Sequence, residues 1–222
     1  MNPILDETKN YYRHDRTEML KYIPDNVRTI LDVGCGEGLF GRAIKQERNC
    51  EVWGVELNSL ATEKAQNNIN KAINGDIVLI LDSLPDQYFD CIVFNDVLEH
   101  LIDPYSLLLK MKNILSKDGV IVCSIPNIRY FRAFIDFLIS KEWKYTDDGV
   151  FDRTHLRFFT YKSIINMFNS LDYDILKIEG LVPIQSWEFK LFELVSIGYL
   201  SDMRYSQYVC IVKPKSAIRP SE

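Results

Sequence analysis

The chain of 222 residues lacks the features that mark several classes of protein. Its longest uninterrupted aliphatic run, residues 77–81, is far shorter than the roughly 20 residues that a membrane-spanning helix needs. Residues 1–10 carry Asp6, Glu7 and Lys9 with no apolar core behind them, so we expect no secretory signal. These absences predict a protein without a membrane span and with a cytoplasmic location.

Metal-binding and disulfide patterns are also missing. The five cysteines form no CxxC pair and the chain has only three histidines, so we predict no metal site. Four cysteines lie in or beside apolar strand-like segments, which is typical of reduced core residues in a cytosolic protein. They are Cys35, Cys91, Cys123 and Cys210. A formal net charge of −5 provides no basic excess, so we expect no nucleic-acid partner.

The composition, 47% hydrophobic and 26% charged, is that of a globular domain. Apolar strand-like runs alternate with segments of helical spacing. The predicted strands are residues 29–33, 51–56, 90–95, 119–125, 173–179 and 207–213. The predicted helices begin at residue 39, span 59–72, run from 104 until Asp118-Gly119, and lie near 186–195. This alternation predicts an α/β fold with a mostly parallel sheet that helices cover on both faces.

Two aromatic segments interrupt the alternation. Residues 127–157 hold six Phe and Tyr residues, Trp143 and four arginines, and residues 181–206 are apolar and aromatic. The helical spacing of residues 130–137 favours packing over contact with a sugar ring. Insertions after the carboxyl ends of strands lie where α/β sheets bind ligands, so we expect both segments to lie beside the substrate. We expect a single domain over residues 1–213 and a disordered tail at 214–222.

The sharpest chemical signal is a glycine-rich turn after the first predicted strand. Residues 30–39 read Ile-Leu-Asp-Val-Gly-Cys-Gly-Glu-Gly-Leu. Glycines at alternate positions let the backbone turn tightly and approach a ligand, and the helix that follows offers free N–H groups. Glu56 ends the second strand, 18 residues after Gly38, where an acid accepts hydrogen bonds from both hydroxyls of a ribose. The pattern predicts a nucleoside-containing cofactor, either nicotinamide or adenosyl.

These residues resemble the motifs of class I S-adenosylmethionine-dependent methyltransferases over residues 10–180. Residues 32–38 are similar to the first motif, 55–57 to the second, 75–77 to the adenine loop, and 89–100 to the fourth strand and its exit. Residues 96–104, 124–127 and 152–160 together resemble a bacterial subgroup that is linked to glycan and cell-surface polysaccharide assembly. The third glycine of a nicotinamide-type motif would fall at Leu39, which counts against an oxidoreductase.

The resemblance implies a Rossmann-like, doubly wound seven-strand sheet with its last strand antiparallel and aromatic insertions after strands 5 and 6. It implies S-adenosyl-L-methionine as the cofactor, with its methionine part at Asp32 and the glycine turn, its ribose at Glu56 and its adenine at Asp76. Asp82 is the alternative adenine contact, because Val78 stands where the subgroup has an acid. The cofactor-binding residues so predicted are Asp32, Gly34, Cys35, Gly36, Gly38, Glu56, Leu57, Asp76, Ile77, Asn95 and Asp96.

Methyl transfer to a hydroxyl calls for a base that titrates near neutrality. The three histidines are the candidates: His100 after the fourth strand, His155 in the first insertion and His14 in the N-terminal segment. His100 could instead be a packed residue at a helix start, His155 could cap a helix that begins near Thr160, and the reaction could use no side-chain base. We name His100 and His155 as the catalytic candidates.

The predicted acceptor is a small molecule, with a sugar hydroxyl of a glycan or nucleotide-sugar pathway favoured. The alternatives are a quinone or another small metabolite, methylated on oxygen or nitrogen, and a cofactor-binding but inactive regulatory subunit. No Asn/Asp-Pro-Pro-Tyr/Phe motif is present, which disfavours methylation of DNA bases or of glutamine. The arginines at 129, 132, 153 and 157 could hold a phosphate or carboxylate, and Tyr11 and Tyr12 could line the acceptor side.

Overall fold

The computed structural model describes residues 15–215. The expectations for Tyr11, Tyr12 and His14, and for the tail from residue 216 onwards, lie outside these residues. The described chain forms two compact units. Unit 1 comprises residues 15–95 and 107–122, and unit 2 comprises residues 96–106 and 123–215. The expectation of one domain over residues 1–213 stays a prediction.

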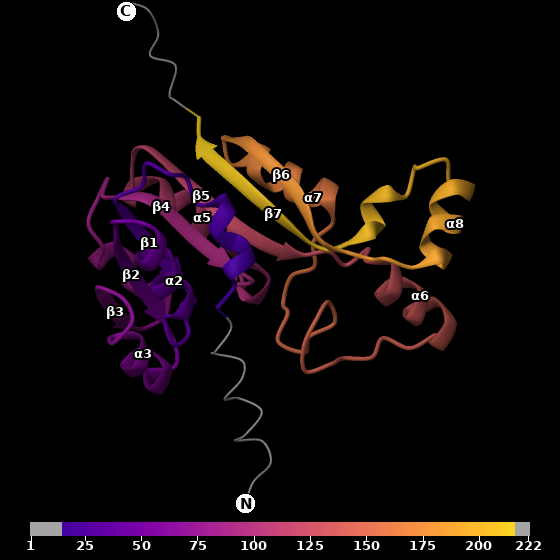
Figure 1. The fold of residues 1–222 in the computed structure, drawn as a ribbon, viewed down its shortest axis with the longest axis horizontal. Coiled ribbons are helices and arrows are strands. Elements are labelled where there is room, and N and C mark those ends of the chain that lie inside the picture. The colour runs from indigo at the N-terminus through magenta and orange to yellow at the C-terminus, as the bar shows by residue number, and fades with distance from the viewer. Residues whose placement is uncertain (1–14, 216–222) are drawn as a thin grey trace, which may run out of the picture. The chain divides into compact units, whose positions relative to one another are not determined.

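Seven strands form a sheet in the order β3-β2-β1-β4-β5-β7-β6 (Figure 1). They are β1 (Thr29–Val33), β2 (Glu51–Glu56), β3 (Lys71–Asn74), β4 (Phe89–Asn95), β5 (Leu115–Pro126), β6 (Tyr173–Pro183) and β7 (Tyr205–Pro214). β1 pairs in parallel with β2 and β4, and β2 pairs in parallel with β3. β6 and β7 pair antiparallel. The predicted α/β sheet with its antiparallel last strand is therefore confirmed.

Helices connect most of these strands. They are α2 (Leu39–Glu47), α3 (Ser59–Ala65), α4 (Ile77–Ile80), α5 (Pro104–Ile114), α6 (Phe131–Ser140), α7 (Tyr161–Ser170) and α8 (Trp187–Val195). Short 3-10 turns complete the elements: η1 (Thr17–Tyr22), η2 (Leu81–Ser83), η3 (Leu98–His100) and η4 (Ser201–Arg204). Within residues 15–215, no helix combines the length and apolar character that crossing a membrane requires.

The predicted helix over residues 59–72 is wrong in its second half, because α3 ends at Ala65 and β3 begins at Lys71. The asparagines that follow α3 bind backbone elsewhere instead of continuing the helix. Asn70 Oδ1 accepts a hydrogen bond from Val52 N at 3.0 Å, which draws this segment against β2. Asparagine competes with helical hydrogen bonding in this way, and the result is an edge strand that the spacing did not reveal.

Two other boundaries differ from the expected ones. α5 ends at Ile114 and β5 begins at once at Leu115, so the strand starts before the predicted residue 119. β6 extends to Pro183 and β7 begins at Tyr205, which leaves residues 184–204 as the connection between them. The longer strands take up the ends of the predicted insertion at 181–206.

The core of unit 1 surrounds its central strand. Ile30 and Leu31 point to opposite faces of β1 and both are fully buried. A parallel strand that is covered on both faces buries all of its side chains, polar ones included. Asp32, the next residue, is 2% exposed. The carboxyl end of β1, from which the glycine turn continues, is therefore buried.

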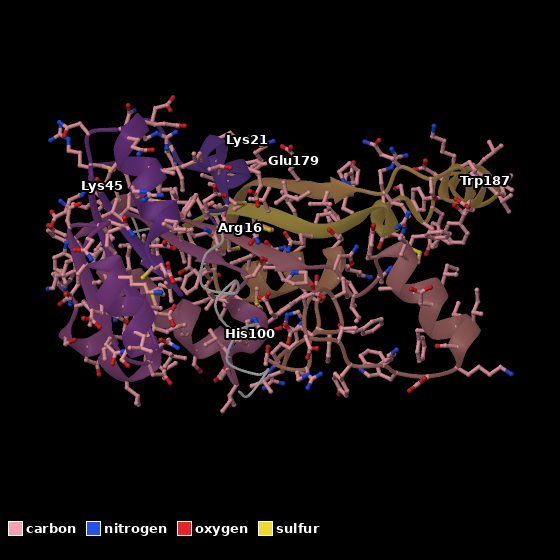
Figure 2. The ribbon with its side chains drawn as sticks, turned by 60° about the horizontal axis from the view of Figure 1, so that its bottom comes forward. Arg16, Lys21, Lys45, His100, Glu179 and Trp187 are labelled. Atoms are coloured by element: carbon pink, nitrogen blue, oxygen red, sulfur yellow. The ribbon has the colours of Figure 1, made fainter. Side chains whose placement is uncertain are left out.

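Unit 2 has its own aromatic cluster. Phe131 of α6 and Phe189 of α8 pack with Ile184 and Met203, and the two phenyl rings lie 5.2 Å apart at their centroids. Figure 1 shows α6 and α8 side by side. The prediction that residues 130–137 pack as a helix is confirmed. The outer side of α8 carries Trp187, which is labelled in Figure 2 and is 70% exposed.

Candidate functional site

The glycine turn begins where β1 ends. Gly34, Gly36 and Gly38 have φ angles of 75°, 53° and 76°, a region that residues with a side chain rarely adopt. The amides of Gly34 and Cys35 both donate to Val55 O, at 2.8 and 3.2 Å, and tie the turn to β2. α2 starts at Leu39, directly after the turn. The backbone conformation therefore requires the glycine spacing that the sequence displays.

Cys35 fills space that a neighbouring glycine leaves open. A Cβ on Gly54 would lie 2.5 Å from Cys35 Sγ, so β2 accommodates this thiol only because residue 54 has no side chain. Burial, and then the charge of Asp32, raises the pKa of the Cys35 thiol well above its ordinary value. A buried, protonated thiol packs rather than binds a ligand. Any contribution of Cys35 to the predicted cofactor site is therefore made by its backbone.

Glu56 joins the ends of three strands. Its carboxylate accepts hydrogen bonds from Gly36 N at 2.9 Å and Asn58 N at 2.8 Å. Its carbonyl accepts from Asn74 Nδ2 at 2.9 Å and from Gly75 N at 3.0 Å. These contacts hold the exits of β1, β2 and β3 together. Sequence reasoning missed Asn74, because it lies at the end of β3, and a helix was predicted over residues 59–72 in place of that strand.

Asp32 is the second acid of this region. It is 2% exposed, and its Oδ2 atom has no hydrogen-bond partner among the described residues. Burial, and to a lesser extent the charge of Glu56, raises the pKa of Asp32 to about 7. An acceptor atom held in this way beside an open backbone turn suits a ligand that brings hydrogen-bond donors and positive charge.

The residues predicted to contact adenine differ in what they expose. Asp76 caps α4, with Oδ1 accepting from Val78 N at 2.8 Å. The Ile77 side chain is 5% exposed and packs in the core, so only its backbone is available to a ligand. Leu57 and Val78 are 72% and 47% exposed. Apolar contact with a flat ring therefore falls to Leu57 and Val78 rather than to the side chain of Ile77.

The end of β4 carries the last two predicted cofactor residues. Asn95 ends the first segment of unit 1, and its buried Oδ1 atom has no hydrogen-bond partner among the described residues. Asp96 opens unit 2 with a φ of 54°, which is strained for a residue with a side chain. Ser124 Oγ donates to Asp96 Oδ1 at 2.8 Å, and Gln207 Nε2 donates to Asp96 Oδ2 at 3.2 Å. Strained residues that are held by several contacts are concentrated at functional sites.

Unit 2 brings together the two histidines predicted as catalytic candidates. The rings of His100, labelled in Figure 2, and His155 lie 4.8 Å apart at their centroids. Glu99 completes the group, with its Oε1 atom 3.9 Å from His155 Nε2. The amides of Leu156 and Arg157 donate to Glu99 O at 2.8 and 2.9 Å, which pins the loop to the turn after β4. We call Glu99, His100 and His155 the histidine cluster.

Backbone groups and Thr154 orient both rings of the histidine cluster. His155 Nδ1 lies 3.2 Å from Val150 O, and His100 Nδ1 lies 3.2 Å from Thr154 O and 3.1 Å from Thr154 Oγ1. Burial, and then the proximity of His100, lowers the pKa of His155. His155 does not cap a helix, because Thr160 caps α7 and its side chain accepts from Ser163 N.

Most of the arginines of the first insertion have partners within unit 2. Arg129 donates twice to Asp202, with Nε 2.7 Å from Oδ2. Arg157 Nε donates to Ile102 O at 3.0 Å, and Arg153 forms an ion pair with Asp147 at 2.5 Å. These contacts favour a structural role for the three side chains over capture of a phosphate.

A family model described as a methyltransferase domain matches residues 5–178. The chain belongs to this methyltransferase family. S-Adenosylmethionine is the cofactor of this methyltransferase, as the resemblance implied. Ubiquinone biosynthesis O-methyltransferase of Coxiella burnetii (strain RSA 493 / Nine Mile phase I) is 27% identical over 197 residues, which are 82% of this chain and 81% of that relative. Malonyl-[acyl-carrier protein] O-methyltransferase of Halalkalibacterium halodurans is 28% identical over 153 residues, 57% of this chain and 56% of that one.

Solved structures show the same fold. A SAM-dependent methyltransferase from Archaeoglobus fulgidus has a TM-score of 0.68 and 22% identity. The match covers 96% of this chain and 100% of the Archaeoglobus chain. A possible histamine N-methyltransferase from Thermotoga maritima has a TM-score of 0.67 and 17% identity, and the match covers 95% of this chain and 96% of the Thermotoga chain. At these identities the likeness concerns the fold, and the reaction must be inferred from the side chains.

The residues of unit 1 fit the cofactor of the methyltransferase. The buried Asp32 Oδ2 atom, which has no partner among the described residues, suits the methionine portion of the cofactor, because that portion carries ammonium and sulfonium charges. The turn at Gly34 and Gly36 leaves room for a close backbone approach. The exposed side chain of Leu57, directly after Glu56, is available to an apolar ring.

Proposed function

We propose that this methyltransferase acts on a hydroxyl oxygen of a small molecule. The observation that carries the cofactor-dependent part of the proposal is the arrangement of Asp32 and Glu56 around the glycine turn: one buried acid with an oxygen that has no partner among the described residues, and one acid that joins three strand ends. Curated relatives named as O-methyltransferases support oxygen as the methylated atom.

In this proposal the residues of unit 1 bind the cofactor. Asp32 takes the positively charged methionine portion, the backbone of residues 34–38 takes its carboxylate, and Glu56 accepts the ribose hydroxyls. Asp76 and the exposed side chain of Leu57 take the adenine. The cofactor supplies a methyl group on a positively charged sulfur, which an oxygen nucleophile displaces. The protein must hold the two reactants in line and exclude water.

Unit 2 supplies the groups that act on the acceptor. Removing the proton of an acceptor hydroxyl needs a group that is neutral and basic near pH 7. A neutral imidazole can accept a proton, and the cluster offers two of them. His100, at the end of η3, is held by Thr154, and His155, on the loop, is held by Val150. We place removal of the acceptor proton at the histidine cluster. The side chain of Asp96, fixed by Ser124 and Gln207, adds a negative charge near the end of β4.

Among acceptors, we propose a phenolic hydroxyl of a quinone-type metabolite. The Coxiella relative, which matches over most of both chains, is named for ubiquinone biosynthesis, whereas neither relative is named for a sugar. A phenol has a lower pKa than a sugar hydroxyl, so a histidine near neutrality can deprotonate it more readily. The sugar acceptor favoured by sequence reasoning thus has less support than the quinone alternative.

Calorimetry and product analysis test the proposal together. The purified chain is titrated with S-adenosylmethionine, S-adenosylhomocysteine and NADH, and the titration is repeated with Glu56→Ala. We expect binding of both adenosyl ligands, loss of that binding in the variant, and none of NADH. The protein is then incubated with S-adenosylmethionine and either a catechol or a nucleotide sugar, and mass spectrometry detects the methylated product.

Each outcome separates the alternatives. Methylation of the catechol alone supports the proposal, and methylation of the nucleotide sugar alone overturns its acceptor class. Cofactor binding without turnover on any phenol, amine or sugar of a broad panel overturns it in favour of a regulatory subunit. Binding of NADH without either adenosyl ligand would contradict the cofactor assignment as well.

A further inference from the structure

The histidine cluster has the composition of a metal site. Glu99, His100 and His155 each offer one ligand atom, and these atoms lie within 4.8 Å of one another. Two imidazole nitrogens and one carboxylate oxygen form a donor set that suits divalent transition metals such as zinc, iron, cobalt and manganese. The sequence predicted no metal site, because it has no CxxC pair and only three histidines. His100 and His155 are 55 residues apart, so no local motif joins them.

The protons on the histidines leave the right atoms available for a metal. Val150 O accepts hydrogen bonds only, so His155 Nδ1 donates to it and His155 Nε2 carries the lone pair. That nitrogen lies 3.9 Å from Glu99 Oε1, which exceeds the length of a hydrogen bond. Two ligands bound at about 2.1 Å in a tetrahedral site are roughly 3.4 Å apart, so the observed spacing needs only a small contraction.

A chain of hydrogen bonds orients His100 in the same manner. Thr154 Oγ1 donates its single proton to Asp152 Oδ1 at 2.6 Å. Towards His100 it is therefore an acceptor, as is Thr154 O, and both lie 3.1–3.2 Å from His100 Nδ1. His100 Nδ1 must then carry the proton, which leaves Nε2 as the free ligand atom. Metal-binding histidines are oriented by such outer contacts, with the second ring N–H bound to a carbonyl or, as here through Thr154, to a carboxylate.

Burial adds to the case. Glu99 is 1% exposed and the side chain of His155 is 5% exposed, whereas His100 is half-buried. A largely buried group with one more accessible ligand resembles a metal site that keeps a position open for another molecule. Asp152, which orients His100 through Thr154, is itself 5% exposed. A cation is favoured at the cluster, because the carboxylate that would bind it, Glu99, and the carboxylate behind Thr154, Asp152, are both buried.

We propose that Glu99, His100 and His155 bind a divalent transition-metal ion, with Thr154 and Asp152 orienting His100. A divalent ion lowers the pKa of a hydroxyl that coordinates to it, so the ion would supply the activation that the two histidines were expected to give as bases. This role in activating the acceptor rests on the proposed function. Metal binding itself does not, because it follows from the contacts within unit 2.

The test uses the full chain without an affinity tag, treated with chelator and then titrated with Co²⁺ while the visible spectrum is recorded. We expect one Co²⁺ per chain, with absorption bands typical of nitrogen and oxygen ligands and without the near-ultraviolet band of a cobalt–thiolate bond. His155→Asn and Glu99→Gln should each weaken Co²⁺ binding by at least about 100-fold, and Thr154→Val by about tenfold. Glu179→Gln, a partly exposed acid paired with Lys177, is the matched control and should bind as the wild type does.

Folding is checked for each variant by circular dichroism and by binding of S-adenosylhomocysteine. Should His155→Asn fail to fold, His100→Asn at the half-buried position gives the same comparison. Absence of Co²⁺ binding by the wild type, a thiolate band, or binding that no cluster variant weakens would each overturn the metal site. Co²⁺ binding with methyl transfer that the metal does not change would leave the site intact and overturn only its role in the reaction. A wild-type protein that does not bind S-adenosylhomocysteine would instead contradict the proposed function.

Discussion

The cofactor-binding region of unit 1 and the histidine cluster of unit 2 are built on different principles. In unit 1 the functional residues sit at the ends of three neighbouring parallel strands, and backbone amides hold their side chains, as Gly36 N and Asn58 N hold Glu56. In unit 2 the cluster is made by an irregular loop that is fastened to the turn after β4 through Glu99 O. The first region is fixed by the sheet, and the second by a few hydrogen bonds between loops.

This difference teaches where each region can change. Strand ends constrain unit 1 to small adjustments, which suits a cofactor that all S-adenosylmethionine-dependent methyltransferases share. Loops in general tolerate more sequence change than the strands that they connect, so we expect the loop from Thr146 to Arg157 to be the more variable region. Acceptor chemistry is therefore expected to diverge in unit 2 while cofactor binding stays constant in unit 1.

The largest effect is expected from Glu56→Ala. The change removes the proposed ribose acceptor and leaves the amides of Gly36 and Asn58 without their partner, at a cost of about 1–3 kcal/mol for each buried group. Affinity for S-adenosylhomocysteine should fall by at least about 100-fold in calorimetry. Glu63→Ala, an exposed acid on α3, is the control and should bind normally. Equal affinity in both variants would show that unit 1 does not depend on Glu56.

A smaller but pH-dependent effect is expected from Asp32→Asn. The pKa of Asp32 is raised to about 7 by burial, against about 3.9 in an unfolded chain. The folded state therefore holds a proton that the unfolded state lacks between these values, and this group makes the fold less stable as pH rises from about 4 to about 7. A positively charged ligand favours the ionised form, so its binding releases the proton and strengthens with rising pH up to about 7.

Titration calorimetry between pH 5.5 and 8 checks this expectation. Affinity for S-adenosylmethionine should rise by up to about tenfold per pH unit below pH 7 and then level off. Asp32→Asn should abolish that rise and, at pH 8, weaken binding by about 10- to 100-fold. A wild-type affinity that falls over this range would contradict a cationic group beside Asp32.

How much the sequence could predict follows the same division. The glycine turn, Glu56 and most of the strands were predictable, because each lies within a short span of chain and follows a local pattern. β3 was not, because the asparagines around Asn70 form side-chain contacts that periodicity cannot register. Glu99 is adjacent to His100 in the sequence. Its place beside His155 depends on how a long loop folds back, which no local pattern encodes.

Substituting one glycine in each unit tests how tightly the two units are packed. Gly38 and Gly149 have nearly equal φ angles, 76° and 78°, but a Cβ on Gly38 would lie 3.2 Å from Ala65 Cα, whereas one on Gly149 would meet nothing within 4 Å. Gly149→Ala should cost about 1–2 kcal/mol from backbone strain alone. Gly38→Ala should cost about 1 kcal/mol more and also weaken cofactor binding. Urea unfolding measures both, and equal losses would show that α3 yields to the added methyl group.

The smallest expected effects come from the two helix caps. Asn58 caps α3 in unit 1 and Thr160 caps α7 in unit 2, and each accepts a hydrogen bond from an amide three residues on. Asn58→Ala and Thr160→Ala should each lower the free energy of unfolding by about 1 kcal/mol. Chemical unfolding measures the two losses side by side. A loss several times larger for Thr160→Ala would mean that α7 stabilises unit 2 by more than its N-terminal cap contributes.

The placement of the five free cysteines has a practical consequence. Cys35, Cys91, Cys123 and Cys210 are buried, and burial keeps the pKa values of the first two thiols far above neutrality, so thiol reagents meet little thiolate there. Cys50, half-buried just before β2, is the accessible native thiol within residues 15–215. It stands at the opposite end of that strand from Glu56, roughly 20 Å away at the rise of an extended chain. A fluorophore attached to Cys50 can therefore follow unfolding of unit 1 without occupying its ligand-binding end.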